Sequence, residues 1–318
     1  AVLGDVRLVN GNILFDDQQN KERHELSDLN ITLALPAMNK TLRLDGSGTL
    51  DGDAFEIKTT LKTPRALLDG KSSTLDGRIS TDLFTATLKG DVTKTDVFSL
   101  DVLADAKIEN VPAFAGKYGV VAPAMTVLNK VSFSTRVTGH PGDLKFSDLS
   151  FRHDSDLLKV NFNGAAALSD SLNFDGAFEL DAPQLRQLAA ATGTTLPAGD
   201  AYKAFKLEGQ AKGGLTKVAL SNASIRFDDI RGEGDLALDL SGVPHLSGSL
   251  TTNVINTTPY ASASGATSST NTKQASDAWQ TDPLDLSPLN AANANLSLTA
   301  DGIRFQDIEI GKSVVKVT

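Results

Sequence analysis

The sequence predicts a mainly β protein built on one long, curved antiparallel sheet. This sheet is a half-pipe groove of repeated β-meanders with a few short connecting helices. Three observations predict this fold. Apolar residues recur at every second position over much of the 318 residues, which places them on one face of extended strands. Short clusters of Asp, Asn, Ser, Gly and Pro separate the alternating runs, as in antiparallel meanders. Helical periodicity is clear in a single segment only.

The first alternating runs lie near the N-terminal end of the sequence. Asn10-Gly11 stands between two apolar runs, a pattern typical of a two-residue hairpin turn, so we expect a hairpin there. Strict alternation then covers Leu26–Leu33, Leu42–Leu50 and Phe55–Leu61. These runs predict a meander with one apolar and one polar face.

Residues 218–250 show the same pattern most clearly. Three alternating runs are separated by Asp228-Asp229 and by the turn cluster at 241–244. Turn formation explains Asp228-Asp229 and the similar pair Asp16-Asp17 better than acid–base chemistry, because both pairs end alternating runs.

One short motif occurs four times: an apolar residue, Ser or Gln, Asp or Asn, an apolar residue, any residue and an apolar residue. The copies begin at Leu26, Phe146, Leu220 and Phe305. Their intervals of 120, 74 and 85 residues (146−26, 220−146, 305−220) are too irregular for a solenoid. Two explanations stay open: an ancient repeated module, or chance matches in a chain rich in strands and turns.

Few segments favour helix. We expect one helix over about 183–192, with Pro183 at its first position and Gly193 at its C-terminal stop. Residues 111–130 are expected to hold a second, broken helix, and residues 291–295 at most one turn.

The predicted domain organisation has three parts. Residues 1–255 form a β-groove region, 256–281 a flexible linker, and 282–318 further strands that continue the sheet. The linker is rich in Ser and Thr and has no apolar periodicity. Because the sequence starts and stops within strand-like runs, we expect it to be a fragment of a longer protein, without that protein's N-terminal membrane anchor.

Composition excludes several functions. A net charge of −9 disfavours nucleic acid as a partner. The absence of cysteine excludes disulfides and thiolate metal sites, and no apolar run is long enough to span a bilayer. The sequence contains no catalytic motif. The histidines lie far apart in polar contexts and are expected at the surface: His24, His140, His153 and His245. We therefore expect no enzyme, no cofactor and no metal.

The number of strands constrains the architecture further. On the order of 20 strands spaced about 4.8 Å apart would form a sheet roughly 100 Å long. Open sheets rarely exceed about ten strands without curling or splitting. The sheet must therefore either close into a sandwich with a dry core or curl into a trough that an apolar ligand fills.

The trough predicts a set of lining residues, which are the apolar members of the alternating runs. The candidates are Leu29, Ile31, Leu33, Leu42, Leu44, Ile57, Leu149, Phe151, Val160, Phe162, Ile225, Phe227, Leu236, Leu238, Leu240, Leu296 and Leu298.

Several segments resemble the AsmA family of bacterial proteins. Trp279-x-x-Asp282-Pro283-Leu284-Asp285-Leu286-Ser287-x-Leu289, followed by the run from Ala294 to Asp301, is similar to a characteristic segment of that family. Residues 228–236, 174–188 and 6–16 are similar to further family strands. The resemblance covers most of the chain, but its motifs are structural, and the insert at 256–278 departs from the family pattern.

The resemblance implies a periplasmic protein of Gram-negative bacteria, anchored to the inner membrane by an N-terminal helix absent here. Its expected role is to bind or conduct phospholipid, or another acyl-chain lipid, along an apolar β-groove. It would thereby contribute to outer-membrane lipid homeostasis and biogenesis, with outer-membrane or envelope proteins as further candidate partners.

Two alternatives belong to other classes. One is a non-enzymatic assembly factor for outer-membrane proteins, with a closed β core and a sheet edge offered to clients. The other is an extracellular β-rich adhesin or polysaccharide-degrading enzyme.

Overall fold

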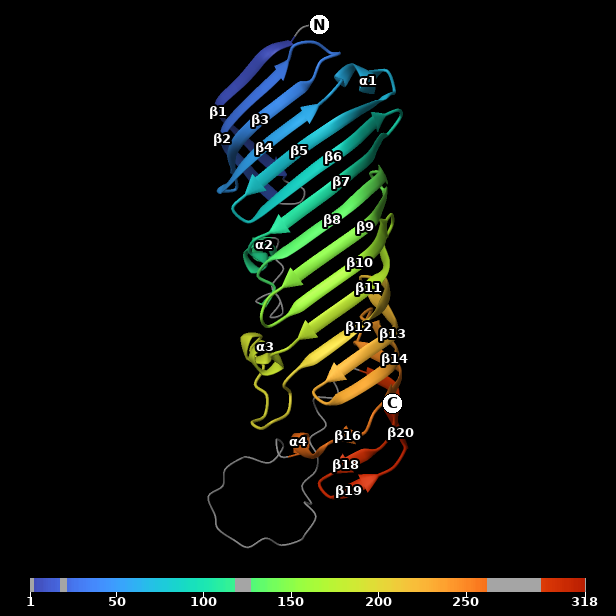
Figure 1. Cartoon of the computed structure of the whole chain (residues 1–318). Coiled ribbons are helices and arrows are strands. Elements are labelled where there is room, and N and C mark those ends of the chain that lie inside the picture. The colour runs from blue at the N-terminus through green and yellow to red at the C-terminus, as the bar shows by residue number, and fades with distance from the viewer. Residues whose placement is uncertain (1–2, 18–21, 118–126, 262–292, 318) are drawn as a thin grey trace. The chain divides into compact units, whose positions relative to one another are not determined.

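The protein is mainly β, as the sequence predicts. The computed structural model (Figure 1) describes the residues 3–17, 22–117, 127–261 and 293–317. Seventeen strands belong to one long, mostly antiparallel sheet. The sheet is not closed: in the described residues, its first strand pairs only with the second and its last strand with one other. The chain forms two compact units, Ala1–Gly176 and Ala177–Thr318.

Unit 1 is an antiparallel meander in which each strand pairs with the next along the chain. Its strands are β1 (Leu3–Asp17), β2 (Glu22–Leu35), β3 (Leu42–Leu50), β4 (Asp53–Leu61), β5 (Ser72–Thr81), β6 (Phe84–Lys94), β7 (Phe98–Ile108), β8 (Val131–His140), β9 (Asp143–Asp154) and β10 (Lys159–Leu168). Helix α1 (Pro64–Leu68) connects β4 to β5, and helix α2 (Val111–Lys117) follows β7. Strand β11 (Leu172–Ala182) extends across the boundary between the units.

The strand register of unit 1 sorts apolar and polar side chains onto opposite faces. Directly opposed residues share a face, so the pairings connect one unbroken row across ten strands. This apolar row is Leu8, Ile31, Gly46, Ile57, Ile79, Ala86, Ala106, Phe133, Phe151 and Phe162. The adjacent row on the other face, the polar row, is Arg7, Thr32, Asp45, Lys58, Arg78, Thr87, Asp105, Ser134, Ser150 and Asn163.

The recurring motif builds a β-bulge in three of its four copies. Asp28, Asp148 and Asn222 adopt left-handed backbone angles, with φ of 53°, 52° and 51°. At each position the register with the neighbouring strand shifts by one residue. Asp and Asn tolerate this conformation better than most residues. The extra residue lets apolar side chains three positions apart, such as Leu220 and Ala223, face the same side. In the fourth copy the left-handed residue is Gln306, in a turn.

Unit 2 contains the remaining elements. The strands β12 (Phe205–Gly214), β13 (Lys217–Phe227), β14 (Ile230–Asp239) and β15 (His245–Thr252) form an antiparallel meander. Strand β17 (Asn293–Ala300) then adds in parallel to β15, and β20 (Ser313–Val317) adds antiparallel to β17. A small second sheet holds β16 (Ile255–Asn256), β18 (Ile303–Phe305) and β19 (Ile308–Ile310). The helices are α3 (Leu185–Ala191) and α4 (Thr258–Ala261).

Some local predictions were wrong. Asn10-Gly11 is no hairpin turn: β1 continues through it with a register shift, and Asn10 has φ of 50°. Helix α3 begins at Leu185, two residues after Pro183, although Gly193 ends it with φ of 79° as expected. Asn293–Asn295 belongs to a strand rather than to a helical turn.

Other predictions are met in part. Val111–Lys117 is helical, whereas the next residues of the expected broken helix, 118–126, lie outside the described ranges. The expected linker at 256–281 starts with ordered elements, β16 and α4, and its part from 262 onward lies outside those ranges.

Candidate functional site

The candidate site in unit 1 is the apolar face of the sheet, which the strand pairings define. All the predicted lining residues of this unit lie on that face: Leu29, Ile31, Leu33, Leu42, Leu44, Ile57, Leu149, Phe151, Val160 and Phe162. Gly46 keeps the row close-packed, because a Cβ there would stand 3.1 Å from Ile57 Cγ2 and 3.4 Å from Ile31 Cγ1. The face is therefore continuous from strand to strand.

Most of this face is only half-buried. Leu29 and Leu149 are buried, with 3% and 9% exposure, whereas Ile31, Ile57, Phe151 and Phe162 keep intermediate exposure. Facing layers of a closed β-sandwich would bury such positions fully. At the edge strand β1 the same face opens further, and Leu8, Ile13 and Phe15 are exposed. The apolar face of unit 1 is thus accessible over much of its length.

Unit 2 repeats this arrangement over fewer strands. One row of paired positions runs Ala211, Leu220, Leu236, Gly248, Leu296 and Val317. The predicted residues Ile225, Phe227, Leu236, Leu238, Leu296 and Leu298 share this face. Leu240 lies one residue beyond β14 and is 45% exposed, and the candidate Leu238 is 37% exposed.

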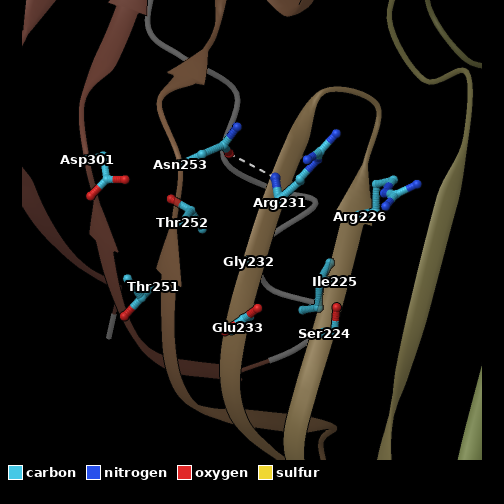
Figure 2. A pocket seen from close by; sticks show the side chains of 10 residues that line it. All are labelled: Ser224, Ile225, Arg226, Arg231, Gly232, Glu233, Thr251, Thr252, Asn253 and Asp301. Atoms are coloured by element: carbon cyan, nitrogen blue, oxygen red, sulfur yellow. Dashed lines mark hydrogen bonds between the residues drawn. The ribbon is translucent and has the colours of Figure 1, made fainter.

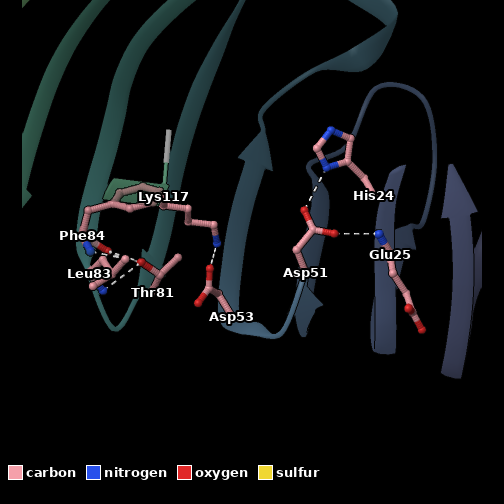
Figure 3. Close-up of polar contacts among 8 residues, drawn as sticks. All are labelled: His24, Glu25, Asp51, Asp53, Thr81, Leu83, Phe84 and Lys117. Carbon is pink, nitrogen blue, oxygen red and sulfur yellow. Dashed lines mark hydrogen bonds and ion pairs between the residues drawn. The ribbon is translucent and has the colours of Figure 1, made fainter. Parts of the chain in front are cut away.

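A discrete apolar pocket adjoins the apolar face of unit 1. It has a volume of about 200 Å³ and lies between the sheet and α2. Phe114 of α2 packs edge-on against Phe84, with ring centroids 5.7 Å apart. Lys117, the last residue of α2, forms an ion pair with Asp53 at the start of β4 (Figure 3). No alternating run in the sequence predicts this pocket.

A polar hollow of about 400 Å³ lies nearby, beside the first part of β2 and the turn between β3 and β4. Asp51 accepts a hydrogen bond from the Glu25 backbone N–H, and its Oδ2 lies 2.8 Å from His24 Nδ1 (Figure 3). The hydrogen bond with His24, followed by that from Glu25, lowers the pKa of Asp51 below its usual value. These contacts tie the first part of β2 to the turn between β3 and β4 and leave Asp51 ionised at neutral pH.

One hollow of unit 2 is lined by polar and charged side chains together with the groove candidate Ile225 (Figure 2). It measures about 380 Å³ and contains Arg226, Arg231, Glu233 and Asp301. Asn253 Oδ1 accepts the backbone N–H of Arg231 at 2.8 Å. Such a lining suits water better than a hydrocarbon chain.

Asp228 holds several segments of unit 2 together through hydrogen bonds. Its carboxylate accepts the backbone N–H groups of Tyr202, Lys203 and Ala204 and the hydroxyl of Tyr260 on α4. Burial acts to raise the pKa of Asp228, but these hydrogen bonds outweigh it and lower the pKa below its usual value. The predicted turn role of this residue is confirmed, because it ends β13 with φ of 51°.

One histidine differs from expectation. His153 is not at the surface: it lies on the apolar face opposite Val131 and Val160, with 1% exposure. Its Nδ1 lies 2.7 Å from the Lys130 carbonyl oxygen, and its buried Nε2 has no hydrogen-bond partner in the described residues. Because a carbonyl oxygen only accepts hydrogen bonds, Nδ1 is the donor in this contact.

Within the described ranges, no three His, Cys, Asp or Glu side chains gather in a way that could hold a metal ion. In the same part of the chain, no helix is long and apolar enough to cross a membrane. No protein-family model, curated protein or solved structure matches the sequence or the fold.

Proposed function

We propose that this chain is part of an AsmA-like protein that binds or conducts phospholipid, or another acyl-chain lipid, along its apolar β face. The observation that carries the proposal is the apolar row of unit 1, which crosses ten paired strands without a polar residue. Nine strand spacings of about 4.8 Å make this track about 43 Å long.

A lipid suits this track for a physical reason. Contiguous half-exposed apolar surface is costly in water, by about 25 cal/mol for each Å² that a ligand could cover. A hydrocarbon chain recovers that energy without needing hydrogen-bond partners, while its head group stays hydrated along the open side. The apolar side chains of this row offer no hydrogen bond to a ligand, which favours an acyl chain that can slide along it.

The resemblance to AsmA proteins supplies the biological setting of the proposal. The protein would act in the periplasm, with an inner-membrane anchor outside this chain, and would contribute to outer-membrane lipid homeostasis and biogenesis. The half-buried state of Ile57 and Phe162 supports this role over an assembly factor with a closed β core.

Two adjacent threonines provide the test. Thr59 lies on the apolar face, opposite Leu44 and Gly77, whereas Thr60 lies on the polar face, opposite Arg43 and Asp76. Thr59→Glu puts a carboxylate into the track, where an acyl chain could not solvate it. Thr60→Glu places the same side chain on the polar face.

Native mass spectrometry of protein purified from bacteria in mild detergent gives the readout. Phospholipid adducts are expected on the wild-type chain and on Thr60→Glu, and a several-fold lower occupancy on Thr59→Glu. Circular dichroism verifies that both variants fold. Absence of lipid from the wild-type chain, or equal loss in the two variants, would contradict the proposal.

A further inference from the structure

The pocket beneath α2 differs from the rest of the apolar face because it is enclosed on more than one side. Three segments form it: the apolar face at β2–β5, the β5–β6 turn, and α2. Its lining residues are Leu26, Leu50, Asp53, Phe55, Ile79, Thr81, Leu83, Phe84, Phe114 and Lys117. Phe55, Ile79 and Leu50 belong to the apolar face by their strand pairing, so the pocket is continuous with the proposed lipid track.

The three polar side chains in this lining are already paired. The Lys117 ammonium forms its ion pair with Asp53. Thr81 Oγ1 accepts the backbone N–H groups of Leu83 and Phe84 at 3.1 and 3.0 Å. Figure 3 shows these contacts. A phosphate, carboxylate or glycerol group placed here would lose its hydration without gaining a new partner.

The volume of the pocket suits a short hydrocarbon segment. An apolar protein cavity of about 150 Å³ lined by Leu, Ile and Phe stays dry and binds benzene. The present pocket, at about 200 Å³, has room for a group somewhat larger than that. The walls therefore accept the end of an aliphatic chain and reject the polar end of the same molecule.

We propose that this pocket holds the methyl-terminal segment of an acyl chain, so that the ligand is bound tail first beneath α2. The inference rests on the proposed lipid-binding function and adds to it an orientation and a fixed end point. The head group then lies away from α2, and the Asp53–Lys117 ion pair keeps the helix closed over the chain end.

Photo-crosslinking tests the orientation. The full chain is incubated with two fatty acids of equal length, one with a diazirine near the methyl end and the other near the carboxylate. After irradiation, the labelled peptides are identified by mass spectrometry. The methyl-end probe is expected to label peptides that contain Leu50, Phe55, Ile79 or Leu83, and the carboxylate-end probe to label other peptides.

The outcomes separate the two proposals. If the methyl-end probe labels the apolar face at β8–β10 but not the pocket, or if the carboxylate-end probe labels the pocket, the orientation is wrong and lipid binding stands. In the first case the pocket is a packing void only. If neither probe labels any apolar-face peptide, the proposed function itself fails.

Matched variants on the two faces of the sheet strengthen the test. Ile79 lines the pocket, whereas Leu103 of β7 lies on the polar face, between Lys89 and Arg136, with 57% exposure. Ile79→Phe should fill the pocket and reduce methyl-end labelling several-fold, while Leu103→Phe leaves that labelling at the wild-type level. Leu83→Phe fills the pocket from the turn and replaces Ile79→Phe if that variant does not fold. Equal labelling of all folded variants would overturn the inference.

Discussion

The assignment of the two faces in unit 1 predicts unequal costs for the same substitution at two leucines. Leu29 of β2 lies on the apolar face with 3% exposure, and its Cδ2 packs over Gly48. Leu103 of β7 lies on the opposite face between Lys89 and Arg136, with 57% exposure. Alternation alone makes both residues ordinary strand leucines. The structure predicts that only Leu29 contributes strongly to stability.

The magnitudes follow from burial. Truncating Leu to Ala removes three carbons, each worth about 0.8 kcal/mol when buried. Leu29→Ala should therefore lose about 2.4 kcal/mol of unfolding free energy by transfer alone, and about 3 kcal/mol with the cavity left behind. Leu103→Ala removes side-chain atoms that are less than half-buried, and no enclosed cavity forms, so about 1 kcal/mol is the most we expect.

Urea unfolding followed by far-ultraviolet circular dichroism measures both costs. Because the two leucines lie in unit 1, the same unfolding transition reports on each. Leu29→Ala should lower the transition midpoint clearly more than Leu103→Ala. Equal shifts, or a larger shift for Leu103→Ala, would show that the faces have been assigned wrongly.

Three further predictions concern single side chains. Asp148→Gly should keep or slightly raise the free energy of unfolding, and Asp148→Val should lower it by about 1–2 kcal/mol in urea unfolding. The reason is that Asp148 has a left-handed φ, which only glycine adopts without strain. Equal free energies of unfolding for the two variants would argue against the bulge. Hydrogen bonds from Ser241, followed by the contact with Lys217, lower the pKa of Asp239 to about 2 from 3.8, and an NMR titration should give that value. The stabilisation of the folded state by ionised Asp239 is complete above pH 3.8 and is lost as the pH falls through about 2. Asp239→Asn should therefore remove this contribution to the loss of stability in acid. An unchanged dependence of stability on pH in this variant would contradict the assignment to Asp239. Gly164→Ala should destabilise unit 1, because the added Cβ would clash with the Asp175 carbonyl oxygen. In the control Gly52→Ala the added Cβ meets open space, but residue 52 has a left-handed φ. The control should therefore lose less stability, from backbone strain alone.

Alternation in the sequence was sufficient to predict the long antiparallel sheet and the face on which most lining candidates lie. It succeeds because a sheet with one apolar face imposes a period of two on every strand. The apolar row also contains Ala86, Ala106 and Phe133, which the same pattern could have identified. The grouping of Leu29 with Ile31 needed no knowledge of tertiary structure.

Other features depend on contacts that sequence spacing does not reveal. The Asn10-Gly11 dipeptide has the composition of a hairpin turn, yet pairing with β2 keeps it inside a strand as a bulge. The pocket under α2 depends on Phe114 meeting Phe84, 30 positions earlier in the chain (114−84). His153 resembles any polar surface residue in sequence, but its strand neighbours bury it. Tertiary packing decided each of these cases.

Cysteine labelling with and without lipid tests the central claim most directly, and the natural chain has no cysteine to interfere. Ile57→Cys places a thiol on the apolar row and Lys58→Cys places one on the polar row. We predict that a maleimide reacts slowly with Ile57→Cys in lipid-loaded protein and rapidly after delipidation, and rapidly with Lys58→Cys in both states. Slow reaction of Ile57→Cys in both states would mean that protein, not lipid, covers the face, and would contradict the account.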